Sequence, residues 1–277
     1  MNGDDLMFAQ WNRAVAALVT ATATPAFPER LESAIRSLVD FDISMVFAYR
    51  GRSRPAIVCN NMAQQVAAVV ADDYVQGPYI LDPFYSEVQR GRVSGIACLA
   101  ELAPDQFYES EYYKRHYSRT RIVDEIGFFM GLRDGVTAVH SVARIEGKPR
   151  FSKEEYARLA DAAAVPNALG TAHWNTAEHA IVFNDASNGA SRFQETDPVE
   201  TALKAVGLGT LTDRQSEIIA LLLKGHSSES IALQLDISVG TVKNHRKNIY
   251  AKLGISSQTE LFSIFLECLR AIVPKDA

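Results

Sequence analysis

Basic and amide side chains gather in one short stretch of the sequence, residues 238–252. This stretch holds four basic residues, two Asn and no Asp or Glu; the cations and the first Asn are Lys243, Asn244, Arg246, Lys247 and Lys252. Ammonium and guanidinium groups bind phosphate, and Lys and Asn can also hydrogen-bond to the edges of bases. The residue types indicate a nucleic-acid contact, although the charge alone is equally compatible with a solvated helix face.

The charge of the whole chain, −5, is acidic, but it is unevenly distributed. Residues 207–277 contain eight Lys or Arg and seven Asp or Glu. Residues 1–206 contain twenty Lys or Arg and twenty-six Asp or Glu. Attraction to phosphate depends on the local field and on counterion release. The net charge therefore does not exclude DNA as a partner.

Three short helices are predicted to position these side chains. Thr212 and Gln215 form a capping box that starts the first helix, and Gly225 is suited to the left-handed residue that ends it. A second helix can be capped by Ser227 or Ser228, and a turn at residues 236–238 leads to a third helix. These signals predict a helix-turn-helix.

The third helix is predicted to begin at Ser238 and to end at Gly254. Val242, Ile249 and Leu253 recur on one face and should be buried. The remaining surface then carries the polar residues Lys243, Asn244, Arg246, Lys247 and Tyr250.

Residues 211–255 resemble the DNA-binding domain of the LuxR family, which also occurs in response regulators of the NarL and FixJ type. The resemblance rests on Leu211-Thr212, Arg214, Glu217, Leu221, Gly225, Ile231-Ala232, Leu235, Ile237-Ser238, Thr241-Val242-Lys243, His245, Ile249 and Lys252-Leu253-Gly254-Ile255. Two residues depart from the pattern: Gln215 replaces a usual Glu, and Gln258 stands where Arg is common.

The resemblance implies roles for individual side chains. Lys243, Asn244 and Lys247 occupy the positions that face base edges in the major groove. Contacts to the DNA backbone are expected from hydroxyls, cations and helix starts, namely Ser227, Ser228, Ser238, Thr241, Arg246 and Lys252. His245 is expected to pack inside the domain.

A fourth helix is predicted after Gly254, opened by a capping box of Ser257 and Glu260. It is apolar on more faces than one small domain can cover. The surplus could pack against the N-terminal half, but the resemblance implies a dimer contact and hence a two-fold related DNA site. The residues assigned to this contact are Leu261, Phe262, Phe265 and Leu269.

The N-terminal half mixes helix and strand signals. Helices are predicted at residues 6–20, 29–39, 62–75, 84–89 and 109–117, and from a capping box of Ser152 and Glu155 toward Trp174. Strands at 45–49 and 56–59 form one hairpin, and strands at 121–132 and 136–145 form a second around Asp134-Gly135. The fold class is therefore α+β, with an antiparallel sheet flanked by helices and an all-α C-terminal domain of four helices.

Three regions follow from this organisation. Residues 1–183 form the first domain, 184–206 have the composition of a linker with a short helix at 198–206, and 207–277 form the helix-turn-helix domain. The order of elements in residues 1–183 resembles GAF or PAS-like sensor domains, which implies a pocket for a small organic effector.

Aromatic and polar residues supply candidates for that pocket, because a ligand site needs apolar walls and a few fixed polar groups. The candidates are Phe47, Tyr49, Tyr74, Tyr79, Asp82, Phe84, Tyr85, Tyr112, Phe128 and His140. Asp82-Pro83 resembles the Asp-Pro pair of acyl-homoserine-lactone receptors. The two Trp that flank that pair in the receptors are missing, which argues against such a lactone. Asp82 can equally be only the cap of a helix that starts at Pro83.

The leading hypothesis is a homodimeric transcription regulator that binds DNA under the control of an effector, and contacts RNA polymerase if it activates. The alternative is a ligand-independent regulator whose N-terminal domain serves dimerisation or partner docking. A phosphorylated response regulator is disfavoured because no strand precedes Asp4-Asp5. The sequence has no Gly-rich phosphate loop, nucleophile elbow or metal-ligand spacing, so neither an enzyme nor a cofactor is expected.

Composition places the protein among globular chains, with 47% hydrophobic and 22% charged residues. Cys59, Cys98 and Cys268 are scattered, which predicts free thiols. His173 and His179 are six residues apart and are not expected to share a helix face. There is no membrane-spanning apolar run and no signal peptide, and a cytoplasmic protein without a metal site is expected.

Overall fold

The computed structural model of the 277-residue chain describes residues 3–51, 53–62, 67, 74–183, 202 and 211–272. The chain falls into two compact units. The first comprises Met1–Ala68, Glu87–Leu102 and Arg121–Asn184, and the second comprises Val69–Ser86, Ala103–Thr120 and Asp185–Ala277. The predicted linker lies outside the described residues except for residue 202, and so does most of the helix predicted at 62–75.

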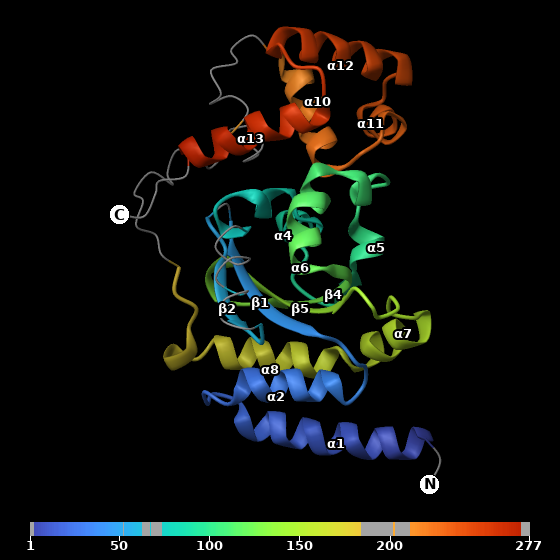
Figure 1. Ribbon diagram of the computed structural model, residues 1–277. Coiled ribbons are helices and arrows are strands. Elements are labelled where there is room, and N and C mark those ends of the chain that lie inside the picture. The colour runs from blue at the N-terminus through green and yellow to red at the C-terminus, as the bar shows by residue number, and fades with distance from the viewer. Residues whose placement is uncertain are drawn as a thin grey trace. The chain divides into compact units, whose positions relative to one another are not determined.

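An antiparallel sheet of five strands forms the centre of the first unit, in the order β2-β1-β5-β4-β3 (Figure 1). The strands are β1 (Ile43–Arg50), β2 (Ala56–Asn60), β3 (Ile96–Cys98), β4 (Ile122–Gly131) and β5 (Val136–Ile145). Both predicted hairpins are confirmed, β1 with β2 and β4 with β5. Strand β3 was not predicted, because three residues are too few to show an alternating pattern.

The turn of the second hairpin has the backbone that its sequence predicts. Asp134 and Gly135 have φ angles of 56° and 70°, both in the left-handed region. Asp-Gly favours this conformation because Gly has no Cβ and Asp tolerates it better than most residues. The turn also forms a short 3₁₀ segment, η4 (Arg133–Gly135).

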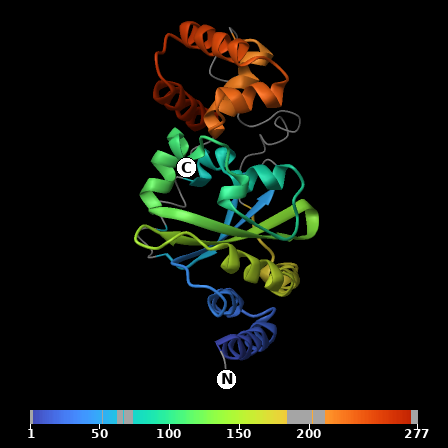
Figure 2. The same ribbon diagram turned by 90° about the vertical axis from the view of Figure 1, so that its right-hand side faces the viewer.

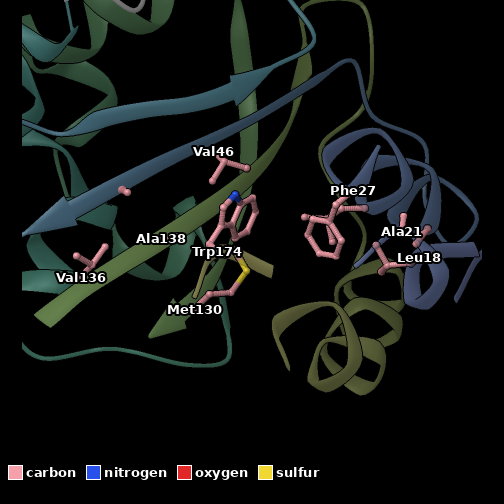
Figure 3. Close-up of a cluster of buried hydrophobic side chains, with 11 residues drawn as sticks. Leu18, Ala21, Phe27, Val46, Met130, Val136, Ala138 and Trp174 are labelled. Carbon is pink, nitrogen blue, oxygen red and sulfur yellow. The ribbon is translucent and has the colours of Figure 1, made fainter. Parts of the chain in front are cut away.

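Helices cover one face of this sheet. Helices α8 (Ala164–Trp174) and α7 (Lys153–Ala162) pack on the strands, α2 (Phe27–Arg36) packs on α8, and α1 (Gly3–Ala21) lies outermost (Figures 1 and 2). Phe27, Met130 and Trp174 meet in the hydrophobic core between the helices and the sheet (Figure 3). A short helix α5 (Leu99–Leu102) follows β3.

The helix predicted from Ser152 toward Trp174 is two helices. The Ser152 and Glu155 capping box is present at the start of α7, as predicted. The helix is interrupted at Ala163, and α8 starts at Ala164. Pro166 lies in the first turn of α8, where its missing N–H and its ring are tolerated, whereas both would disrupt a continuous helix.

His173 and His179 come together, which corrects the expectation from their spacing. Helix α8 ends at Trp174, and the chain turns back through the 3₁₀ turn η5 (Ala177–His179). The two imidazole rings then stack with their centroids 4.5 Å apart. The spacing argument assumed one continuous helix, and the chain reversal removes that assumption.

The second unit contains the C-terminal helices α10 (Asp213–Lys224), α11 (Ser228–Leu235), α12 (Val239–Leu253) and α13 (Gln258–Ile272) (Figure 1). Its other segments are short: the 3₁₀ turns η1 (Pro78–Leu81) and η2 (Phe107–Glu109), the π-helix η3 (Tyr113–Tyr117) and α6 (Ser118–Thr120). Helix α4 (Pro83–Gln89) begins in this unit. The helix predicted at 109–117 is present from residue 111, continues through the π-helical turn η3 into α6, and is preceded by the separate 3₁₀ turn η2.

The predicted caps of α10, α11 and α12 are confirmed. Thr212 and Gln215 form the capping box of α10, while Ser227 and Ser238 cap α11 and α12. The cap of α13 is only half as predicted. Ser257 Oγ accepts the Glu260 N–H, but the Glu260 carboxylate accepts the backbone N–H of Ser256.

Candidate nucleic-acid interface

Helix α12 presents its basic face to solvent. Lys243, Asn244 and Lys247 are exposed, whereas Val242 and Ile249 are buried against α10 and α11. The period of about 3.6 residues separates these two sets onto opposite faces. The three side chains assigned to base edges are therefore on the accessible surface of a helix-turn-helix.

Two other residues of α12 differ from their predicted surroundings. Leu253 is half-buried, not fully buried, at the end of the helix. Tyr250 is also half-buried, and its hydroxyl is enclosed without a hydrogen-bond partner among the described residues. His245 is half-buried, which is compatible with the packing role expected for it.

The polar side chains that are predicted to contact the DNA backbone lie near the starts of two helices, α12 and α11. At the start of α12, Ser238 Oγ and Thr241 Oγ1 are 2.8 Å apart. At the start of α11, Arg246 Nη1 donates to Ser228 Oγ over 3.3 Å. A guanidinium beside a helix N-terminus is suited to hold an anion.

Ser227 and Ser228 are nevertheless buried in this structure, with 5% and 6% of their surfaces exposed. In this conformation Ser227 and Ser228 therefore lack the exposure that the predicted phosphate contacts require. The residue that covers the start of α11 is Asp105, whose Oδ1 accepts the Ser227 N–H over 2.9 Å. The sequence separation of 122 residues explains why local reasoning missed it.

The two departures from the family pattern are explained by contacts within the domain. Gln215 Oε1 accepts from the Thr212 N–H and from Lys252 Nζ, at 3.1 and 2.9 Å. The Gln258 side-chain amide donates to the Leu222 carbonyl over 3.0 Å, near the end of α10. Lys252, predicted to contact DNA, thus reaches back to the start of α10.

Comparison with known proteins agrees with this geometry. Residues 209–265 match the bacterial regulatory proteins of the luxR family. An HTH-type transcriptional regulator from the exeN 3′ region of Aeromonas salmonicida is 32% identical over 188 residues, which cover 68% of this chain and 94% of that protein. This chain belongs to the luxR family of bacterial regulatory proteins.

Two further similarities concern parts of this LuxR-family regulator. The monoamine regulon transcriptional regulator of Klebsiella aerogenes is 47% identical over 53 residues, 19% of this chain and 23% of that protein. The crystal structure of the VqsR LBD domain from Pseudomonas aeruginosa covers 59% of this chain and 95% of its own, with a TM-score of 0.52 and 23% identity. The latter similarity shows a shared fold.

In this LuxR-family regulator the fourth helix, α13, is covered by the chain itself. All four residues assigned to dimerisation are buried: Leu261, Phe262, Phe265 and Leu269. The Arg115 guanidinium lies 5.2 Å from the centroid of the Phe262 ring, and Gly77 packs against Leu269. Of the two arrangements that the sequence allowed for α13, this structure has the one in which the helix packs against N-terminal residues. Pairing through Phe262 and Leu269 requires that contact to open.

Asp82 lies at the centre of a polar cluster in the second unit. Its Oδ1 accepts the Phe84 and Tyr85 N–H groups at 2.7 and 3.4 Å, and its Oδ2 accepts the Tyr74 and Tyr112 hydroxyls at 3.0 and 3.3 Å. Burial raises the pKa of Asp82 to about 6, against the hydrogen bonds that lower it. Asp82 therefore caps α4, and four groups of the chain use its oxygens.

The four candidate residues of the sheet do not share one face. His140 is opposite Val46 and Phe128 in the sheet, whereas Phe47 and Tyr49 are opposite Val139 and Thr137. Phe128 belongs to the core with residues of α2 and α7. Because neighbouring residues of a strand point to opposite faces, Phe128 and His140 cannot line one pocket with Phe47 and Tyr49.

His140 is a buried polar residue of this core. Its Nε2 is 2.8 Å from Ser44 Oγ, and burial lowers the pKa of His140 to about 4. The imidazole is therefore neutral at pH 7. Its place in the core corrects the prediction that it contacts an effector.

The remaining candidates, Tyr79, Phe84 and Tyr85, are buried, and the Tyr79 and Tyr85 rings meet edge to face at 5.1 Å. The second unit also has an open cavity of about 170 Å³ that contains no predicted effector residue. It is lined by Gln76, Pro78, Arg115, His116, Arg119, Leu266 and Leu269. The residues predicted from aromatic content thus form packed clusters.

Other expectations concern groups outside these clusters. The three cysteines are free. Within the part of the chain that the structure describes, no cluster of three or more His, Cys, Asp or Glu could hold a metal ion. In that same part, none of the helices has the length and apolar character to span a membrane.

Proposed function

We propose that this transcriptional regulator reads DNA sequence with Lys243, Asn244 and Lys247, inserted into the major groove on α12. The observation that supports this is the exposure of these three side chains on the outer face of a helix whose inner face is buried. Lys can donate to guanine and Asn can bond adenine at two atoms. Ser238, Thr241 and Arg246 then bind phosphates and set the register.

Alanine substitution separates base contacts from phosphate contacts. An operator is first selected in vitro from random duplex DNA, and affinities are then measured for it and for single-base variants. Lys243→Ala, Asn244→Ala or Lys247→Ala should each relax the preference at particular base pairs, at about 1–3 kcal/mol for a good contact. Arg246→Ala is the control and should weaken all sequences alike. Uniform weakening by the three α12 variants would contradict base reading.

Regulation by a small organic effector is the second element of the proposed function, in an N-terminal domain of GAF or PAS-like type. Buried polar groups among aromatic rings, such as Asp82 with Tyr74 and Tyr112, provide the mixed apolar and polar surroundings that ligand sites use. An effector acts only if it binds two states of the protein with different affinity.

A ligand-independent regulator is favoured by a different observation. Both carboxylate oxygens of Asp82 are used by the chain's own hydrogen bonds, so the residue has a sufficient structural role as a helix cap. In that case the N-terminal domain serves dimerisation or the docking of a partner such as RNA polymerase.

A thermal-shift screen against metabolites distinguishes the two functions. A true effector raises the melting temperature, and above Kd the stabilisation grows with the logarithm of its concentration. Asp82→Asn should abolish the response if Asp82 anchors the ligand, while the fold remains because Asn also caps helices. A chain that no compound stabilises favours the ligand-independent function.

A further inference from the structure

Residues 103–107 bind directly to the start of helix α11, within the second unit. Asp105 Oδ1 accepts the backbone N–H of Ser227 over 2.9 Å. The next residue, Gln106, donates its N–H to the Gly225 carbonyl over 2.9 Å. The segment is therefore attached through the Asp105 side chain to Ser227 and through the Gln106 backbone to Gly225, beside the predicted phosphate contacts.

The sequence of α11 provides no side chain of its own to accept the Ser227 N–H, so this donor is available to Asp105. Ser227 is the cap of the helix, and the third residue of the helix is Ser230. A Glu there could reach back to the Ser227 N–H, as Glu155 does to Ser152 in α7, but a Ser cannot. The helix start also favours negative charge. Partial burial would raise the pKa of Asp105, but hydrogen bonds from Ser227 hold it below its ordinary value, so the group is anionic at neutral pH.

Gly225 permits the close approach of this segment. A Cβ at this position would lie 2.9 Å from the Cα of Phe107 and 3.2 Å from the Gln106 carbonyl oxygen. Phe107 is fully buried, which fixes the segment in place. Ser227 and Ser228 are buried, and the contact brings a carboxylate to a helix start whose Ser228 also receives a hydrogen bond from Arg246.

We propose that the Asp105 carboxylate occupies the position of a DNA phosphate at the start of α11, so that DNA and residues 103–107 compete for the same donors. Ser227, Ser228 and Arg246 are the groups for which they compete. The inference rests on the proposed function, and it adds the sequence prediction that Ser227 and Ser228 at the start of α11 bind the DNA backbone. In this conformation the helix-turn-helix lacks one of its backbone contacts, and release of the segment restores it.

The test compares DNA affinities of full-length variants on a mixed-sequence duplex, for which binding depends on phosphate contacts. Asp105→Ala should tighten binding by about tenfold, the effect of losing one charge-assisted hydrogen bond from the competing state. Glu109→Ala is the matched control, because it removes the same charge from the same region and its carboxylate is not bound to Ser227. Equal affinities for the two variants would overturn the inference.

Hydrogen exchange gives a second readout that does not depend on a substitution. When DNA is added to the unchanged protein, the backbone amides of residues 105–107 should exchange faster, because the segment is displaced. Unchanged or slower exchange there would also overturn the inference.

Failure of the inference can be told apart from failure of the proposed function. On the operator selected in vitro, Lys247→Ala should weaken binding whether or not Asp105 competes with phosphate. If Lys247→Ala weakens binding and Asp105→Ala changes nothing, only the role of Asp105 is wrong. If neither variant changes the affinity, DNA does not bind through α11 and α12 at all.

Discussion

The role of a polar side chain in this protein depends on whether its oxygen and nitrogen atoms are exposed to a partner or are already hydrogen-bonded within the chain. Lys243, Asn244 and Lys247 are exposed on α12, so their chemistry is available to a partner. Asp82 and His140 are also polar, but hydrogen bonds within the chain use them. Residue type alone does not distinguish the two situations.

The buried imidazole of His140 leads to a prediction about pH. Its pKa is lowered to about 4 in the folded chain, whereas an unfolded His has a pKa near 6.5. Between these values the unfolded state binds more protons, so the free energy of unfolding rises with pH and falls on acidification. From pH 7 to pH 5 the loss that His140 contributes should be about 2 kcal/mol.

Urea unfolding at several pH values checks this, with His140→Gln as the variant that cannot titrate. The difference between wild type and variant isolates His140 from His173, whose pKa is also lowered to about 4. NMR titration of the His140 ring protons in the unchanged protein gives an independent value. A ring that titrates near pH 6.5, or parallel stability curves for the two proteins, would contradict the prediction.

At the scale of elements, the ends of the C-terminal helices are specified within a few residues of each helix. Thr212, Ser227 and Ser238 cap the starts, and Gly225 and Gly254 end α10 and α12 in the left-handed region. These signals are local hydrogen bonds and backbone preferences, so they could be predicted from sequence. The break between α7 and α8 was missed although Pro166, in the first turn of α8, marks it in the sequence.

The two helix-ending glycines allow a matched comparison. Gly225 and Gly254 have φ angles of 95° and 64°, but only Gly225 has a close neighbour, the Phe107 backbone. Gly254→Ala should cost about 1–2 kcal/mol from the left-handed backbone alone. Gly225→Ala should cost about 1–3 kcal/mol more, because the new methyl group overlaps another backbone segment.

Denaturant unfolding of both variants gives these free energies. Circular dichroism under native conditions serves as the control that each variant still folds. If the two substitutions cost the same, residues 103–107 do not pack on Gly225 as in this structure.

At the scale of the whole molecule, the apolar face of α13 is covered by N-terminal residues of the second unit. The sequence offered both this arrangement and a dimer contact. We expect the regulator to bind DNA as a pair, with the contact on α13 opened or with pairing through another surface. Two linked half-sites then raise the effective concentration of the second copy.

Binding as a pair is tested by measuring the affinity of the protein for duplexes that carry one or two copies of a selected half-site. A two-fold site should bind at least about a hundredfold more tightly than a single half-site, with two protein copies per duplex. Inserting about 5 base pairs between the half-sites rotates them by half a turn and should remove the gain. One copy per duplex, with equal affinity for all three DNAs, would contradict pairing.

The sequence by itself determined the features that local chemistry specifies: the helix caps, the two hairpins, the buried stripe of Val242 and Ile249, and the basic outer face of α12. Hydrogen bonds within one helical turn and apolar periodicity encode these features. Tertiary structure alone decided that Asp105 binds Ser227, that Phe128 and His140 belong to the core, and that α13 is covered. Each of these depends on residues tens of positions apart, whose proximity follows from how the elements pack.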